Sequence, residues 1–174
     1  CGFRYGVKRA VELALKAANE NNDVATLGPL IHNPQMIAML AKNKVGCLEQ
    51  LSDFAEAATV VLRSHGVGPE VYEQSTAKGL KIIDATCPNV LSAQRRVACM
   101  AAEGYLPVII GEKNHPEVQS ILAWAGPQGC IVETIADIKN VPPADKYGVV
   151  VQTTFEVEKF EEMIKLLQRD RSGE

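Results

Sequence analysis

Short β-branched runs that alternate with helical segments are the feature that most constrains the fold of this chain. The clearest runs are Val24–Leu27, Thr59–Leu62 and Pro107–Ile110. Between such runs, apolar residues recur at helical spacing, as they do over residues 6–21 and 155–169. This alternation is typical of parallel sheets whose faces are covered by helices.

The same pattern predicts the remaining elements and a division into two halves. Further helices are expected over residues 33–42, 68–78, 88–103, 116–125 and 134–139, and further strands over 80–83, 130–132 and 149–151. Thr154 or its neighbour is expected to cap the last helix. A turn at residues 84–88 separates the halves. We therefore expect an α/β protein of two consecutive three-layer units with mostly parallel sheets, a first domain over residues 1–86 and a second over residues 87–174.

Composition and charge restrict the classes of partner. The formal net charge is −3, which gives no reason to expect nucleic acid or an anionic membrane surface. No apolar run approaches the roughly 18 residues of a membrane span. The five cysteines are widely spaced without a CxxC pair, which favours a reducing, cytoplasmic location over a disulfide framework. The chain begins at Cys1 and ends directly after a helix, so we expect it to be part of a longer protein.

Each of the three histidines stands in a loop directly after a predicted strand. His32 precedes Asn33-Pro34, His65 lies in Ser-His-Gly-Val, and His115 lies in His-Pro-Glu-Val. The carboxyl ends of parallel strands meet at one edge of a sheet, so these loops predict one shared site. Imidazolium groups, loop N–H groups and helix N-termini all favour phosphate oxygens, which indicates anion binding.

A thiol, a carboxylate and two hydroxyls have similar settings. Cys87 precedes Pro88 at a predicted helix start, where a thiolate is stabilised. Glu117 follows His115 by two residues and is a candidate proton donor in a dry site. Thr153 and Thr154 are candidate ligands of a hydroxyl or phosphate, although helix capping would also explain them. By contrast, the remaining internal cysteines are expected to be buried as small apolar residues: Cys47, Cys99 and Cys130.

Residue types and spacing leave the chemistry open between two mechanisms. One is a zinc-dependent hydrolase with His and Cys87 as ligands and Glu117 as base. The other is a phosphate-binding cage around an iron–sulfur cluster held by Cys. A separate alternative is a non-catalytic diphosphate-binding protein in which Arg4 contributes a cation.

The motifs, taken in order, resemble one enzyme family over essentially the whole chain. The series is Gly-Val-Lys-Arg-Ala, His-Asn-Pro, Ser-His-Gly-Val, Asp-Ala-Thr-Cys-Pro, His-Pro-Glu-Val and Gln-Thr-Thr. It is similar to the 4-hydroxy-3-methylbut-2-enyl diphosphate reductases, the terminal enzymes of the non-mevalonate isoprenoid pathway. The resemblance implies reductive dehydroxylation of the allylic diphosphate to isopentenyl and dimethylallyl diphosphates, with an electron donor such as ferredoxin or flavodoxin.

The resemblance also implies an architecture and a role for each candidate residue. The family has three α/β domains in a trefoil-like arrangement, and each provides one Cys to a 4Fe–4S cluster. By this resemblance Cys87 is a cluster ligand, and Glu117 is the acid with Thr153 beside it in the proton relay. The remaining residues would bind the diphosphate, as would Thr153: His32, His65, His115 and Thr154.

Two departures from the family pattern matter. The first cluster Cys of the family falls at Arg4, and a guanidinium cannot replace a thiolate as an iron ligand. Cys1, three residues earlier, is a candidate replacement, or Arg4 could supply a cation in a non-catalytic relative. The third Cys would lie beyond residue 174, in a third domain that this chain lacks. We therefore expect the 174-residue chain to be inactive by itself.

Overall fold

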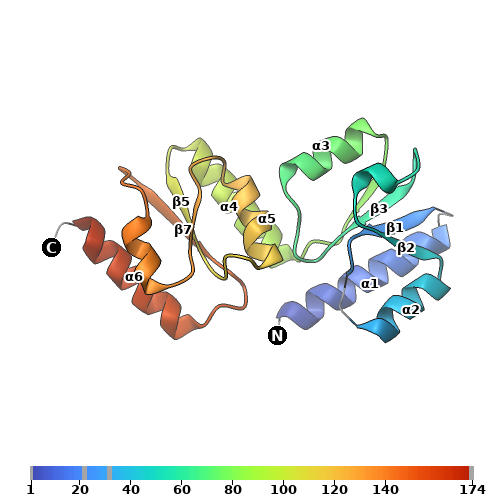
Figure 1. Ribbon diagram of the computed structural model, residues 1–174, viewed down its shortest axis with the longest axis horizontal. Coiled ribbons are helices and arrows are strands. Elements are labelled where there is room, and N and C mark those ends of the chain that lie inside the picture. The colour runs from blue at the N-terminus through green and yellow to red at the C-terminus, as the bar shows by residue number, and fades with distance from the viewer. Residues whose placement is uncertain (1, 21–22, 31–32, 173–174) are drawn as a thin grey trace. The chain divides into compact units, whose positions relative to one another are not determined.

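The structure is a computed structural model that describes residues 2–20, 23–30 and 33–172. The chain forms two units, residues 1–88 and 89–174, and each is built around its own parallel sheet (Figure 1). In the part of the chain that the structure describes, no helix is both long enough and apolar enough to cross a membrane.

The first unit contains four parallel strands in the order β2-β1-β3-β4. The strands are β1 (Val24–Leu27), β2 (Val45–Leu48), β3 (Thr59–Leu62) and β4 (Lys81–Asp84). The helices are α1 (Gly2–Glu20), α2 (Pro34–Lys42) and α3 (Pro69–Ala77), with a 3-10 turn η1 (Leu51–Asp53). Asn33 and Pro34 start α2 as the sequence predicts, because the Asn33 side chain accepts hydrogen bonds from the N–H groups of Gln35 and Met36.

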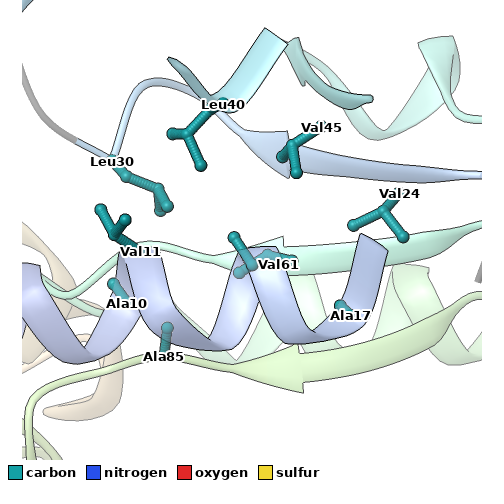
Figure 2. Packing of buried hydrophobic residues seen from close by; sticks show 10 residues of the cluster. Ala10, Val11, Ala17, Val24, Leu30, Leu40, Val45, Val61 and Ala85 are labelled. Carbon is teal, nitrogen blue, oxygen red and sulfur yellow. The ribbon is translucent and has the colours of Figure 1, made fainter. Parts of the chain in front are cut away.

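Successive residues of a strand point to opposite faces of this sheet. Buried clusters lie on both faces, so the unit has three layers. Val61 packs into a cluster with α1 and α2, whereas Val60 and Leu62 pack into a second cluster on the other face. Figure 2 shows the first cluster, in which the small side chains Ala10 and Ala17 let α1 approach the sheet closely. Its labelled members are Ala10, Val11, Ala17, Val24, Leu30, Leu40, Val45, Val61 and Ala85.

The second unit contains three parallel strands in the order β6-β5-β7. They are β5 (Leu106–Ile110), β6 (Cys130–Val132) and β7 (Tyr147–Val151), and the helical elements are α4 (Pro88–Ala102), α5 (Pro116–Trp124), η2 (Ile135–Asn140) and α6 (Val157–Ser172). The α6 helix and η2 cover one face through a buried cluster. Its members are Leu106, Val108, Ile110, Val132, Ile138, Val141, Met163 and Leu167.

The predicted α/β class with parallel sheets is confirmed, but three local predictions are wrong. Strand β2 was not expected, because it is an edge strand interrupted by Gly46 and exposed at its centre. The last helix begins at Val157, so neither Thr154 nor its neighbours cap it; the Thr154 hydroxyl instead accepts a hydrogen bond from Gln152. Cys47 and Cys99 are exposed rather than buried.

The strand order reverses once in each sheet, and these reversals place the loops of interest. The chain passes from β1 outward to β2 and then returns to β3 on the other side of β1. In the second unit it passes from β5 to β6 and returns to β7 on the other side of β5. The loops that follow such neighbouring strands leave in opposite directions, which is where open α/β sheets bind ligands.

The core of the second unit can be tested with one matched pair of substitutions. Ile110 is 1% exposed and Ile135 is 46% exposed. Ile110→Ala should lower the free energy of unfolding by about 2–5 kcal/mol, because it leaves a cavity. Ile135→Ala should change it by less than about 0.5 kcal/mol. Urea denaturation followed by circular dichroism measures both, and equal effects would contradict the assigned core.

Candidate functional site

In the first unit the Cys87 loop is held against two other segments. Cys87 lies between β4 and α4, and its N–H donates to the carbonyl of Ser64 at 2.9 Å. Gly6 of α1 lies against the thiol, because a Cβ atom at Gly6 would stand 3.5 Å from the Cys87 Sγ atom. The loop that carries His65 and the start of α1 therefore both meet Cys87.

Three further hydrogen bonds fix the residues that precede Cys87. Arg9 donates from Nη1 to the carbonyl of Thr86 at 3.1 Å, and the Thr86 N–H donates to Asp84 Oδ1 at 2.9 Å. The Tyr72 hydroxyl donates to Asp84 Oδ2 at 2.9 Å. Burial, and then the neighbouring Asp84 carboxylate, raise the pKa of Tyr72 to about 12. No sequence motif indicates a role for Tyr72, because only the fold brings α3 beside the end of β4.

Two histidines, His65 and His32, belong to loops that follow strands of the first sheet. His65 is half-buried in a turn in which the Gly66 N–H donates to the Arg63 carbonyl at 3.0 Å. Gly66 has a φ of +78°, a conformation that favours glycine. His32 lies outside the described residues, although its loop begins at Gly28, directly after β1.

In the second unit a buried carboxylate is paired with an exposed threonine. Glu117, in the first turn of α5, is 3% exposed. Its Oε1 atom accepts from the Thr153 N–H at 2.7 Å, and its Oε2 atom accepts from the Thr153 hydroxyl at 2.8 Å. Thr153 follows β7 and is exposed. The hydroxyl therefore links an enclosed acid to the surface, as a proton relay requires.

His115 takes part in the same turn as the cap of α5. Its Nδ1 atom accepts a hydrogen bond from the Glu117 N–H at 3.1 Å. An imidazole that accepts at Nδ1 does so in its neutral form, with the proton on Nε2. The arrangement places the ring at the N-terminus of a helix, where anions are favoured.

Gln152 supports this arrangement and was not singled out from the sequence. It is 2% exposed, its Oε1 atom accepts from the Glu112 N–H at 2.9 Å, and its Nε2 atom donates to the Thr154 hydroxyl at 3.2 Å. A Cβ atom at Gly111 would stand 2.8 Å from the Gln152 Oε1 atom, so only glycine permits this approach. The amide thus joins the loops that follow β5 and β7.

The donors that the structure describes do not complete an iron–sulfur cluster, which needs several thiolates. Across residues 2–20, 23–30 and 33–172, no three His, Cys, Asp or Glu side chains converge as metal ligands do. Cys47 lies on β2, and Cys99 on α4 donates to Glu103, which raises the pKa of its thiol.

Each of the two parallel sheets has polar loops at its strand-order reversal, and the second unit carries a buried acid there. This arrangement is typical of α/β proteins that bind ligands at the carboxyl ends of their strands. The chain belongs to the LytB protein family, whose model matches residues 1–172. This confirms the resemblance that the motifs predicted.

Relatives and solved structures of the same description agree with this assignment. The chain is 40% identical over 163 residues to a 4-hydroxy-3-methylbut-2-enyl diphosphate reductase of Citrifermentans bemidjiense, covering 94% of this chain and 58% of that protein. It is 45% identical over 167 residues to the Aquifex aeolicus reductase, covering 94% and 57%.

Two solved reductases share the fold. One, described as the terminal enzyme of the non-mevalonate pathway, aligns with a TM-score of 0.86 and 43% identity, covering 95% of this chain and 60% of that one. The Plasmodium falciparum reductase aligns with a TM-score of 0.88 and 28% identity, covering 95% and 53%. The chain thus spans less than two thirds of the length of these relatives.

The burial of Tyr72, together with the neighbouring Asp84 carboxylate and the hydrogen bond between them, predicts a specific pH dependence. The pKa of Tyr72 is about 12 in the folded chain and ~10 when unfolded, so the protonated tyrosine stabilises the fold. This contribution is complete below about pH 10 and is lost as the pH rises towards 12. Between pH 9 and 12 the unfolding free energy should therefore fall by about 1 kcal/mol more for the wild type than for Tyr72→Phe.

Urea denaturation at each pH checks this prediction. Asp84→Asn serves as the control, since it removes the charge that opposes ionisation of Tyr72 and should reduce the same difference. Identical pH profiles for the wild type and Tyr72→Phe would contradict the assigned bond.

Proposed function

We propose that this chain supplies the proton-delivering and part of the diphosphate-binding machinery of a 4-hydroxy-3-methylbut-2-enyl diphosphate reductase. The reaction removes the C4 hydroxyl of the (E)-allylic diphosphate as water and gives isopentenyl and dimethylallyl diphosphates. Two electrons and two protons enter, and the electrons come from an external donor such as ferredoxin or flavodoxin. The observation that carries the proposal is the buried Glu117 carboxylate bonded by both the N–H and the hydroxyl of Thr153, in a chain of this family.

The proton path follows from this pair. A hydroxide is a poor leaving group, so the departing oxygen must receive a proton. When Glu117 holds a proton it donates to the Thr153 oxygen, and the Thr153 hydroxyl proton passes to the substrate. The relay needs no movement larger than a rotation of the Thr153 hydroxyl, because its oxygen already lies 2.8 Å from the Glu117 Oε2 atom.

We propose that the diphosphate is bound by the three histidines together with Thr153 and Thr154. Charge-assisted and neutral N–H donors suit phosphate oxygens. His115 stands at the start of α5. The Thr154 hydroxyl oxygen accepts a hydrogen bond from Gln152, so the Thr154 hydroxyl proton is left to donate to another acceptor. His65 follows β3, and His32 keeps this role as a proposal although it lies outside the described residues.

We further propose that Cys87 is one ligand of a 4Fe–4S cluster and that Cys1 is a candidate second ligand in place of Arg4. Gly6 packs against Cys87, so the start of α1 reaches this thiol. Cys47, Cys87 and Cys99 are thiols outside any disulfide, which supports a reducing, cytoplasmic setting. We also propose that residues 1–86 and 87–174 act as two domains and that other parts of a longer protein provide the third.

The relay can be tested by substitution in a protein of the relatives' length that carries this sequence. Glu117→Gln should lower kcat by about 10²- to 10⁴-fold with little change in KM, because it removes proton transfer rather than binding. Thr153→Val should lower kcat to a similar degree and also raise KM, because we assign its hydroxyl to both the relay and the diphosphate. Thr153→Ser should keep most of the activity, since it keeps the hydroxyl. Glu103→Gln, at an exposed position directly after α4, is the matched control. Unchanged kcat in Glu117→Gln would overturn the assigned role.

Cluster assembly gives a separate test that uses the 174-residue chain. After anaerobic incubation with iron and sulfide, this chain should form no stable cluster and show no turnover, because its donor set is incomplete. In a protein of the relatives' length that carries this sequence, Arg4→Cys should raise the bound iron and sulfide, and Cys87→Ser should lower them. If Cys1→Ser leaves the cluster content of a longer protein unchanged, Cys1 is excluded as a ligand. A stable cluster with turnover from this chain alone would contradict the prediction.

A further inference from the structure

Arg63 occupies the strand-order reversal of the first sheet, and neither the motifs nor the mechanism uses it. It directly follows β3, and its side chain covers Gly28, which directly follows β1. A Cβ atom built at Gly28 would stand 3.3 Å from the Arg63 Nη1 atom and 3.7 Å from Cζ. Because Gly28 has a φ of +70° and no side chain, the guanidinium can lie against the backbone here. Arg63 therefore spans the ends of the two strands between which the order reverses.

The guanidinium has no protein acceptor in the described part of the chain. Its Nε atom is buried and lacks a hydrogen-bond partner. The ion pairs that join Lys8 to Glu12 and Lys159 to Glu156 do not involve Arg63. Leaving a buried charged donor without an acceptor is costly. Such a cost is expected where a ligand supplies the missing acceptor.

The acid at the neighbouring strand end is already engaged. Asp84 closes β4, which pairs with β3, but its Oδ1 atom accepts from Thr86 and its Oδ2 atom accepts from Tyr72. A candidate anion ligand, His65, instead stands two residues after Arg63.

We propose that Arg63 binds a phosphate group of the substrate and is a specificity-determining residue for the diphosphate end. The inference rests on the proposed function, because it assumes that this edge of the first sheet receives the diphosphate. A planar guanidinium offers two parallel N–H donors to two oxygens of one phosphate, which a lysine ammonium cannot do. The site therefore prefers phosphate and diphosphate anions to uncharged alcohols.

The test titrates inorganic pyrophosphate into the 174-residue chain by isothermal calorimetry at fixed ionic strength. Arg63→Gln removes the charge. Arg63→Lys keeps the charge and the hydrocarbon stem but loses the two parallel N–H donors of the guanidinium. Arg96→Gln removes the same charge from an exposed position of α4 and is the matched control. We expect Kd to rise by roughly tenfold or more in Arg63→Gln, by less in Arg63→Lys, and by under about twofold in Arg96→Gln.

The outcomes separate this inference from the function on which it rests. If both Arg63 variants bind pyrophosphate like the wild type while His65→Asn weakens binding, the role of Arg63 is overturned and the proposed function stands. If Arg63→Gln only lowers the unfolding free energy, or if Arg96→Gln has an equal effect on Kd, the inference is also overturned. If the wild type shows no binding at millimolar pyrophosphate, both the inference and diphosphate binding by this chain are overturned. If Arg63→Gln does not fold, the Kd of Arg63→Lys for pyrophosphate decides: a rise supports the inference and an unchanged value overturns it.

Discussion

The reversal of strand order in each parallel sheet is the constraint on which the rest of the structure depends. Parallel pairing fixes β1 beside β3, with Val24 opposite Thr59, and fixes β5 beside β7, with Ile110 opposite Val151. That register sends Gly28 and Arg63 to one shared edge, and the loops of Glu117 and Thr153 to another. The backbone ladders, rather than contacts among the polar side chains, thus determine where the chemistry is located.

The polar groups at the two strand-order reversals differ in how completely they are hydrogen-bonded. In the second unit, Glu117 receives two hydrogen bonds from Thr153, and both ends of the Gln152 amide are bonded. A fully bonded network of this kind holds its members in one geometry, which suits proton transfer. In the first unit the Arg63 Nε atom is buried without a partner. In our proposals, the bonded pair of Glu117 and Thr153 acts as the relay, and a bound anion supplies the acceptor that Arg63 lacks.

The sequence predicted most elements because strongly periodic runs and Pro-initiated helices leave little choice of local structure. It missed β2, whose Gly46 and exposed centre hide a strand that forms only by pairing with β1. It also placed Cys99 inside, since the neighbours Val97 and Ala98 suggested a buried helix face. One position on a helix turns a side chain by about 100°, so Val97 is buried and Cys99 is exposed.

By itself, the sequence determined the α/β class, the loops that carry the histidines, and the motif series that identifies the family, because these depend on neighbouring residues. Only the tertiary structure decided which polar atoms meet. Glu117 and Thr153 are 36 positions apart, and Arg63 reaches Gly28 from a different strand. Such pairings depend on strand order and register, and local hydrophobic periodicity carries no information about either.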